Sequence, residues 1–185
     1  MDCKEKLGAC AVRSVSRLLL EHVRARPQWV RSLLRDLRIE GYGSHRWQHL
    51  KRLIADPLVE CIVSSNRECF NGCLEEVYIG DLTGGEHSYV EGHGGRDLDI
   101  IIKLRTGCKH AVEEDVEKVL EDAVSIVLEE VFGVDFHRLL GIPNIIEVHI
   151  VDGPDAFPYY QMIESSSPCL VKVWPKERGG AGETC

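Results

Sequence analysis

The sequence of 185 residues lacks any long apolar run, and its first residues do not form an apolar segment either. A helix needs about 20 mostly apolar residues to cross a bilayer, and a secretory signal needs an apolar stretch of roughly 7 to 15 residues. Residues 1–6 instead carry mostly charged side chains. We therefore expect a cytoplasmic protein that makes no contact with a membrane.

Side-chain amides are scarce, because the chain contains only three Asn and three Gln. Depletion of these thermolabile residues is typical of proteins from hyperthermophiles, so we expect a thermophilic source. Cysteine is not scarce, but no two of the eight cysteines are spaced as C-x2-C. Cys61, Cys69 and Cys73 are spaced as C-x7-C-x3-C, which does not match a structural zinc site. Reduced, buried cysteines are the default expectation, and disulfide bonds of unknown pairing are the alternative that a hyperthermophile allows.

The remaining composition, with 44% hydrophobic and 28% charged residues, is that of an ordinary globular domain. Charge is distributed unevenly: residues 1–60 contain 12 Lys and Arg against 7 Asp and Glu, whereas residues 61–185 contain 10 against 23. The basic first third either contacts the phosphates of a nucleic acid or forms solvated helix faces. The sequence has neither the spacing of a zinc finger nor interleaved aromatic and basic residues, so it predicts no particular nucleic-acid-binding motif.

Residues 1–60 are expected to form a basic helical segment. A first helix ends before Pro27 and carries an apolar stripe formed by Val12, Val15, Leu18, Leu19, Leu20 and Val23. A second helix begins at Pro27 and places on its outer face Arg31, Arg35 and Arg38. Ser44 is the expected N-cap of a third helix that ends near Pro57. These helices form a small bundle packed on the main domain or, alternatively, a helix-turn-helix.

From residue 74 onward the pattern changes to strands. We expect strands at residues 77–79, 98–104, 145–151 and 169–174, with a long helix of acidic outer face at residues 113–132. The predicted fold class is therefore α+β, with a small mixed β-sheet and helices packed on one face, preceded by the N-terminal helical segment. The predicted domains are the helical segment 1–60, an α/β domain at residues 61–175 and a frayed tail at residues 176–185.

Two carboxylates begin the strand at residues 98–104. Asp97 and Asp99 lie two residues apart, so the period of a strand directs both side chains to the same face, about 6–7 Å apart. Like charges this close raise each other's pKa, and a hard divalent cation such as Mg²⁺ or Mn²⁺ resolves the repulsion. Magnesium usually keeps waters and substrate phosphate oxygens as further ligands. Alternatively, the two aspartates are an exposed acidic pair at the end of a strand.

The sequence VYIGDLTGGE of residues 77–86, followed by RDLDIII of residues 96–102, resembles the nucleotidyltransferase superfamily of the DNA polymerase beta type. In that family a strand ends in G-S-x-x-x-G and the partner strand begins with D-x-D. The resemblance covers residues 74–151 and implies that Gly80, Asp81 and Gly85, with the neighbouring Gly84, form the loop that binds the nucleotide phosphates.

The resemblance also implies a third carboxylate on the strand that follows the long helix. Glu147 stands at this position, within an apolar strand where a carboxylate is costly to bury unless it is paired or bound to a metal. Alternatively, Glu147 and His149 point outward from a solvent-facing strand, and Asp152 is then the reserve candidate for the third carboxylate. Asp97, Asp99 and Glu147 are thus the predicted catalytic and metal-binding residues.

The implied activity is metal-dependent transfer of a nucleoside monophosphate from a nucleoside triphosphate to an unidentified acceptor, with Mg²⁺ or Mn²⁺ as cofactor. Lys103 shares the strand face of the two aspartates and either binds phosphate or forms a salt bridge within the acidic sheet. Arg96 is a further candidate for phosphate. In the loop, His87 and His93 are plain polar residues or, alternatively, bind a transition metal with Asp81 or Glu86.

Asp81 departs from the family pattern, because it places a negative charge where the family has serine. This departure favours a second function. In that alternative, the chain has the nucleotidyltransferase fold without turnover and is a binding or regulatory module, which contacts nucleic acid or a partner protein through its basic helices.

Overall fold

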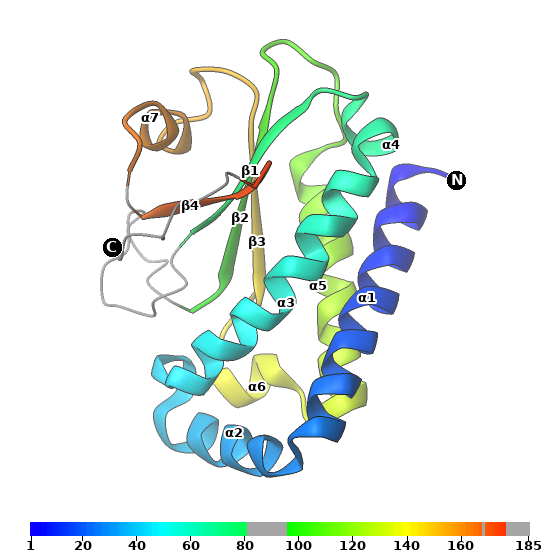
Figure 1. Ribbon diagram of the computed structural model, residues 1–185. Coiled ribbons are helices and arrows are strands. Elements are labelled where there is room, and N and C mark those ends of the chain that lie inside the picture. The colour runs from blue at the N-terminus through cyan, green and yellow to red at the C-terminus, as the bar shows by residue number, and fades with distance from the viewer. Residues whose placement is uncertain (81–95, 168, 177–185) are drawn as a thin grey trace.

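The computed structural model describes residues 1–80, 96–167 and 169–176, and it has the predicted α+β fold (Figure 1). Its helices are α1 (Cys3–Ala25), α2 (Pro27–Glu40), the 3₁₀ turn η1 (Gly41–Gly43), α3 (His45–Ser64), α4 (Asn66–Phe70), α5 (Glu113–Phe132), α6 (Phe136–Leu140) and α7 (Tyr159–Glu164). Its strands are β1 (Leu74–Gly80), β2 (Leu98–Leu104), β3 (Ile146–Val151) and β4 (Leu170–Trp174). None of the helices within these ranges has both the length and the apolarity needed to span a membrane.

The four strands form one mixed sheet in the order β3-β2-β1-β4. β1 pairs antiparallel with β2 and with β4, whereas β2 and β3 are parallel. A parallel pair requires a crossover connection, and α5 provides it between β2 and β3. The three consecutive isoleucines of β2 are fully buried, as expected for a central strand covered on both faces.

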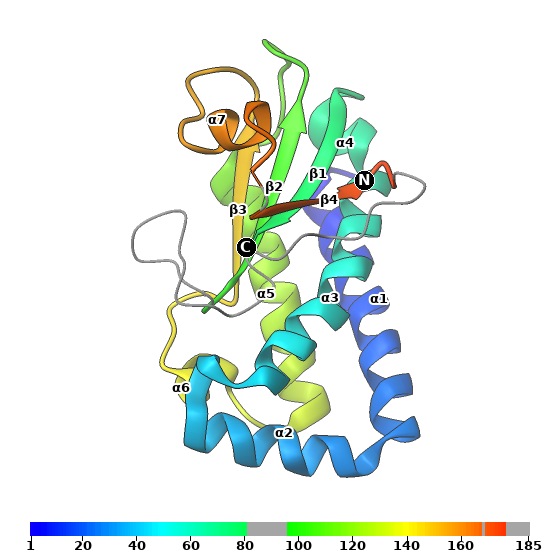
Figure 2. The same ribbon diagram turned by 60° about the vertical axis from the view of Figure 1, so that its left-hand side comes forward.

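Helices α3 and α5 lie on one face of the sheet with α1 packed against both of them, and α7 lies on the other side (Figures 1 and 2). One continuous apolar core joins these three helices to the inward side chains of β1, β2 and β3. The division expected at residue 60 falls inside α3, and residues on both sides of it, such as Leu58 and Ile62, enter the same core. The N-terminal helices α1 and α3 therefore share one hydrophobic core with the sheet, whereas the basic α2 packs against α1, α3 and α6.

The predicted helix ends are confirmed at several positions by their capping residues. α1 ends at Ala25 and α2 begins at Pro27, where the missing N–H of proline costs no helical hydrogen bond. Ser44 caps α3 by accepting a hydrogen bond from the backbone N–H of Arg46 at 3.2 Å. Gly133, with φ of 70°, ends α5 in the left-handed conformation that glycine adopts without strain.

Two expectations for the helices were wrong. α3 does not end near Pro57 but continues to Ser64 with Pro57 buried inside it. The turns beyond Pro57 bury Leu58, Cys61 and Ile62 completely, and this burial offsets the backbone hydrogen bond that proline cannot make. In α1, the fully buried residues are spaced by four, at Leu7, Ala11, Val15 and Leu19. Val12 and Leu20 lie one position beyond this face and are exposed.

Three disulfide bonds join described cysteines: Cys3–Cys69, Cys10–Cys61 and Cys73–Cys108. Two of them attach α1 to α4 and α3, and the third attaches the segment before β1 to the segment after β2. The default expectation of reduced cysteines is therefore wrong for these six residues. Cys61, Cys69 and Cys73 each have a different partner, so they do not form a shared metal site.

The acidic side of α5 covers the free edge of β3. Glu113, Glu117 and Glu121 are spaced by four residues, so they form a row along one side of the helix. Their carboxylates accept hydrogen bonds from the backbone N–H groups of Ile150 at 2.5 Å, of Val148 at 2.9 Å, and of Ile145 and Ile146 at 2.9 and 2.7 Å. The outward N–H groups of an edge strand, which otherwise remain available for pairing with another chain, are thus occupied by carboxylates from the same chain.

Candidate metal centre

The predicted carboxylates come together at one edge of the sheet. In the parallel ladder of β2 and β3, Asp99 is the direct register partner of Glu147. In the antiparallel ladder of β1 and β2, Asp99 is the register partner of Gly80, the last residue of β1. Asp97 precedes β2 by one residue and makes a side-chain hydrogen bond with Glu147. Three acidic residues that are up to 50 positions apart in the sequence therefore meet beside the end of β1.

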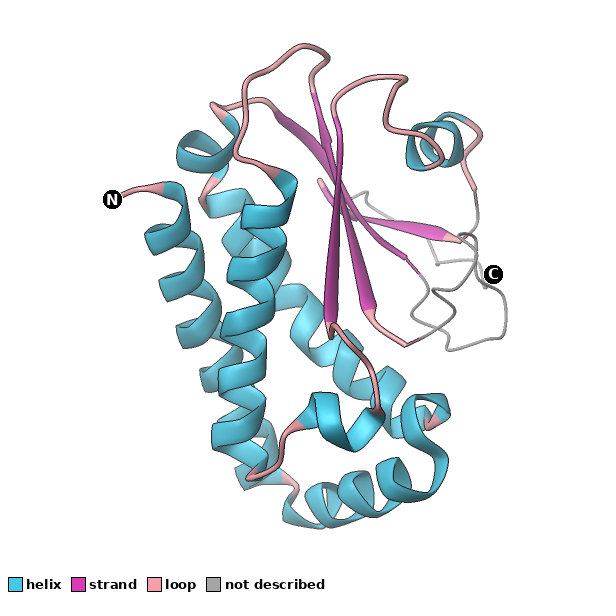
Figure 3. Ribbon diagram, turned by 180° about the vertical axis from the view of Figure 1, so that it is seen from behind, coloured by secondary structure: helices cyan, strands magenta, loops and turns pink. Residues whose placement is uncertain are grey.

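These side chains lie on the face of the sheet opposite α1, α3 and α5, which we call the outer face. Leu98, Ile100 and Ile102 of β2 enter the main core, so the alternating Asp99 and Ile101 point to the other side. A second, smaller apolar cluster of Ile101, Val151, Tyr159 and Leu170 covers part of the outer face. Figure 3 shows α7, which contributes Tyr159, across the sheet from the long helices. The carboxylates therefore lie next to a small apolar layer.

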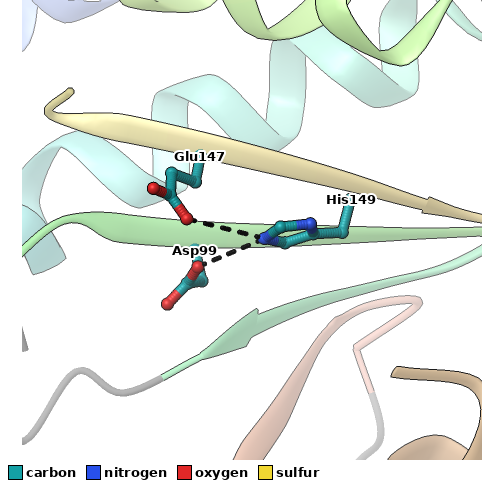
Figure 4. A group of neighbouring side chains, drawn as sticks. All are labelled: Asp99, Glu147 and His149. Atoms are coloured by element: carbon teal, nitrogen blue, oxygen red, sulfur yellow. Dashed lines mark ion pairs between the residues drawn. The ribbon is translucent and has the colours of Figure 1, made fainter. Parts of the chain in front are cut away.

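His149 completes the cluster from the same strand as Glu147. Figure 4 shows its ring directed toward the two carboxylates, with Nε2 at 3.4 Å from Asp99 Oδ1 and 3.8 Å from Glu147 Oε2. One ligand atom from each of Asp99, Glu147 and His149 lies within 4.8 Å of the other two. On its other side, the His149 ring stacks on Tyr159, with ring centroids 4.1 Å apart and an angle of 22° between the ring planes.

The acidic residues of this cluster are strongly desolvated. Asp97 and Asp99 are each only 3% exposed. Burial, together with the negative charge and hydrogen bond of Asp97 and the charges of Asp99 and Glu117, raises the pKa of Glu147 from 4.5 to about 8. Without a cation, the cluster therefore holds a proton on Glu147 at neutral pH, because burying several adjacent anions is unfavourable.

Helix α3 supports the start of β2 from the opposite side. The indole Nε1 of Trp47 donates to the backbone carbonyl of Arg96 at 2.7 Å, and Lys51 Nζ donates to the carbonyl of Asp97 at 3.0 Å. Both Trp47 and Lys51 are fully buried. A lysine is almost never fully buried unless a partner offsets the cost of burying its charge. Lys51 lies behind Asp97, so the acidic end of the sheet is close to it. These two bonds fix the backbone that carries Asp97 and Asp99.

The donor atoms of the cluster fit a divalent cation. Asp99 Oδ1 and His149 Nε2 are both buried, and neither has a hydrogen-bond partner within the part of the chain that the structure describes. Carboxylate oxygens are the usual protein ligands of Mg²⁺ and Mn²⁺, and imidazole nitrogen is a ligand of transition metals. Asp97, Asp99, Glu147 and His149 are therefore the residues that would hold such an ion.

The other predicted binding residues are only partly accounted for. Gly80 lies beside Asp99, whereas Asp81, Gly84, Gly85 and the loop histidines are outside the described residues. Lys103 Nζ lies 3.2 Å from Glu76 Oε2, which agrees with the salt-bridge alternative, and its role in phosphate binding stays a prediction.

The reserve candidate, Asp152, lies just after β3, and its carboxylate is 3.2 Å from Nε2 of His110. The carboxylate that the structure brings next to Asp97 and Asp99 is that of Glu147, and the role of Asp152 stays a prediction. His149 is the member of this cluster that sequence reasoning did not assign to the site. The available signal was its spacing of two residues from Glu147, which places both on one face of a strand.

No protein-family model, no curated protein and no solved structure matches this chain.

Proposed function

We propose that the protein is a metal-dependent nucleotidyltransferase that transfers a nucleoside monophosphate from a nucleoside triphosphate to an acceptor hydroxyl. The observation that carries this proposal is the meeting of Asp97, Asp99 and Glu147 beside Gly80 on adjacent strands. The resemblance to the nucleotidyltransferases of the DNA polymerase beta type predicts a carboxylate triad of this kind next to a glycine loop.

Each residue has a distinct task in this proposal. A divalent cation supplies charge neutralisation at the phosphate and lowers the pKa of the attacking hydroxyl. Asp97 and Asp99 hold the cation on a backbone that Trp47 and Lys51 fix from behind. Glu147 is the third ligand or takes the proton of the acceptor.

The predicted phosphate-binding residues that follow Gly80 lie outside the described residues. The described residues on either side of that segment, Gly80 and Arg96, lie at the edge where the carboxylates meet. We keep the assignment that the family resemblance implies, in which a glycine loop at this place in the sequence binds the β- and γ-phosphates. Lys103, four residues from Asp99, lies about 13 Å farther along the strand, so the proposal does not require it beside the metal, and its contact with phosphate stays a prediction.

The second candidate function is a binding module without turnover. Its support is the exposed basic face of α2, where Arg31, Arg35 and Arg38 are all exposed. In this case the N-terminal helices contact nucleic acid or an acidic partner, and the carboxylate cluster has a structural role.

Calorimetric titration with each of the four nucleoside triphosphates in the presence of Mn²⁺ separates the two functions. We expect binding of at least one triphosphate, and loss of that binding in the Asp97→Asn, Asp99→Asn double variant. Asp155→Asn, at an exposed position outside the cluster, is the matched control and should bind as the wild type does. Absence of heat with all four nucleotides in folded protein would exclude the transferase and leave the binding module.

The proposed compartment is the cytoplasm of a thermophile. Intracellular disulfide bonds are rare in mesophiles but occur in hyperthermophiles, so the three disulfide bonds agree with this setting. A thermal midpoint within the mesophilic range of about 45–65 °C would contradict it.

A further inference from the structure

We infer that His149 is a direct ligand of the ion held by Asp99 and Glu147, so that the site prefers Mn²⁺ over Mg²⁺. The inference rests on the proposed function only for the presence of a divalent ion. It adds a nitrogen ligand to the three carboxylates predicted from the sequence, and it assigns the metal preference of the site to one residue.

The distances between the donor atoms support coordination more than a salt bridge. Two ligands of one ion with bonds of about 2.0–2.1 Å lie roughly 3–3.4 Å apart in tetrahedral or octahedral geometry. The distance from His149 Nε2 to Asp99 Oδ1, 3.4 Å, is at the upper end of this range, and the distance to Glu147 Oε2, 3.8 Å, is slightly longer. Moreover, Nε2 forms a hydrogen bond with neither carboxylate, although it is buried between them (Figure 4).

The His149 ring is held in this orientation by its surroundings. Tyr159 stacks on one side of it, and β3 carries it two residues from Glu147. Asp99, the carboxylate nearest to Nε2, has a side chain that is only 5% exposed. A fixed imidazole at a largely buried site binds an ion without the cost of ordering a flexible ligand.

The ligand type determines the preferred metal. Mg²⁺ is bound by oxygen and usually keeps several waters, so a nitrogen ligand adds little to its affinity. Imidazole binds first-row transition metals more readily than it binds Mg²⁺. Removing His149 should therefore weaken Mn²⁺ binding and leave Mg²⁺ binding nearly unchanged.

Pulsed electron paramagnetic resonance of Mn²⁺ bound to the full chain tests the ligand directly. We expect coupling of the manganese electron spin to a ¹⁴N nucleus in the wild type and its loss in His149→Ala. His110→Ala is the matched control, because the side chain of His110 is 20% exposed against 22% for His149 and also faces a carboxylate. This variant should keep the coupling.

Equilibrium titration completes the test, with Mn²⁺ followed by its own resonance signal and Mg²⁺ measured by competition. We expect His149→Ala to reduce the preference for Mn²⁺ over Mg²⁺ on the order of 10- to 100-fold. His149→Gln, which cannot supply imidazole nitrogen, should behave in the same way if the alanine variant fails to fold. Bound Mn²⁺ without ¹⁴N coupling, or a preference unchanged in both variants, would overturn the inference and leave the proposed transferase intact. Absence of Mn²⁺ binding would overturn both.

Discussion

The raised pKa of Glu147 predicts that the metal-free protein loses stability as the pH rises. The carboxyl group titrates at about 8 in the folded protein, against an ordinary value of 4.5. Between these two values the folded chain binds more protons than the unfolded chain, so the free energy of unfolding decreases with increasing pH. The contribution of Glu147 is fully present below pH 4.5 and is lost as the pH rises through 8.

The size of this effect follows from the shift of the pKa. Each pKa unit corresponds to about 1.4 kcal/mol, so the full shift sets an upper limit of about 5 kcal/mol. Glu147 keeps some contact with solvent, which reduces the effect. We therefore expect the free energy of unfolding to fall by about 2 kcal/mol between pH 5 and pH 8 because of this residue.

Urea denaturation in the presence of EDTA measures this contribution as the difference between the wild type and Glu147→Gln. The variant is needed because Asp36, Glu68 and Glu76 have lowered pKa values in the folded protein, so these groups make the free energy of unfolding increase with pH. Since glutamine does not titrate, the pH-dependent part due to Glu147 should be missing from the variant. Saturating Mn²⁺ should remove the loss in the wild type by displacing the proton. If the difference between the two proteins stays constant from pH 5 to pH 8, the assigned electrostatics are wrong.

Three further predictions concern the edge strand, the disulfide bonds and the basic helix. Glu117→Leu leaves the buried N–H of Val148 without its acceptor, so urea denaturation should show a decrease of about 1–3 kcal/mol in the free energy of unfolding. The control Glu114→Leu, at an exposed position, should change this free energy by less than about 0.5 kcal/mol. Equal effects of the two substitutions would contradict the contacts at the edge of β3. Reduction of the disulfide bonds should lower the thermal midpoint, since disulfides that close loops of 35 to 66 residues each typically contribute about 2–4 kcal/mol to the free energy of unfolding. An unchanged midpoint in protein whose thiols have been shown by titration to be reduced would refute this prediction. If α2 contacts nucleic-acid phosphates, the Arg31→Ala, Arg38→Ala double variant should reduce the salt slope of duplex binding by about two units, and salt-independent binding would return α2 to a structural role.

The parts of the fold that the sequence predicted well are those with a strong period. The helix at residues 113–132 and the strand at residues 98–104 were predicted with the bounds that α5 and β2 have. The short helices α4, α6 and α7 were missed, because one or two turns contain too few apolar residues to show a period. Pro57 was interpreted as the end of a helix, since local propensity does not include the burial of the turn that follows it.

The candidate site was predictable to the extent that it depends on strand alternation. The two-residue spacing placed Asp97 and Asp99 together, and the resemblance placed Glu147 on a neighbouring strand. Spacing alone does not reveal the stacking of His149 on Tyr159, because α7 reaches the outer face only through the tertiary fold. The buried lysine behind the site was missed for a similar reason: Lys51 lies on a helix with basic neighbours, where solvent exposure is the usual expectation.

The acidic face of α5 connects the architecture to the site. From the sequence this face was predicted only as the acidic outer face of the helix, and in the structure its glutamates accept hydrogen bonds from the N–H groups of β3. These bonds fix the position of β3 along the axis of α5, and the ladder with β2 then places Glu147 opposite Asp99. A slip of β3 by one residue would turn Val148 to the outer face and bury Glu147 in the main core, since side chains alternate along a strand. Glu117 also contributes to the raised pKa of Glu147 through its charge. The same row of carboxylates therefore protects the edge of the sheet, sets the register that forms the site, and increases the need of the site for a cation.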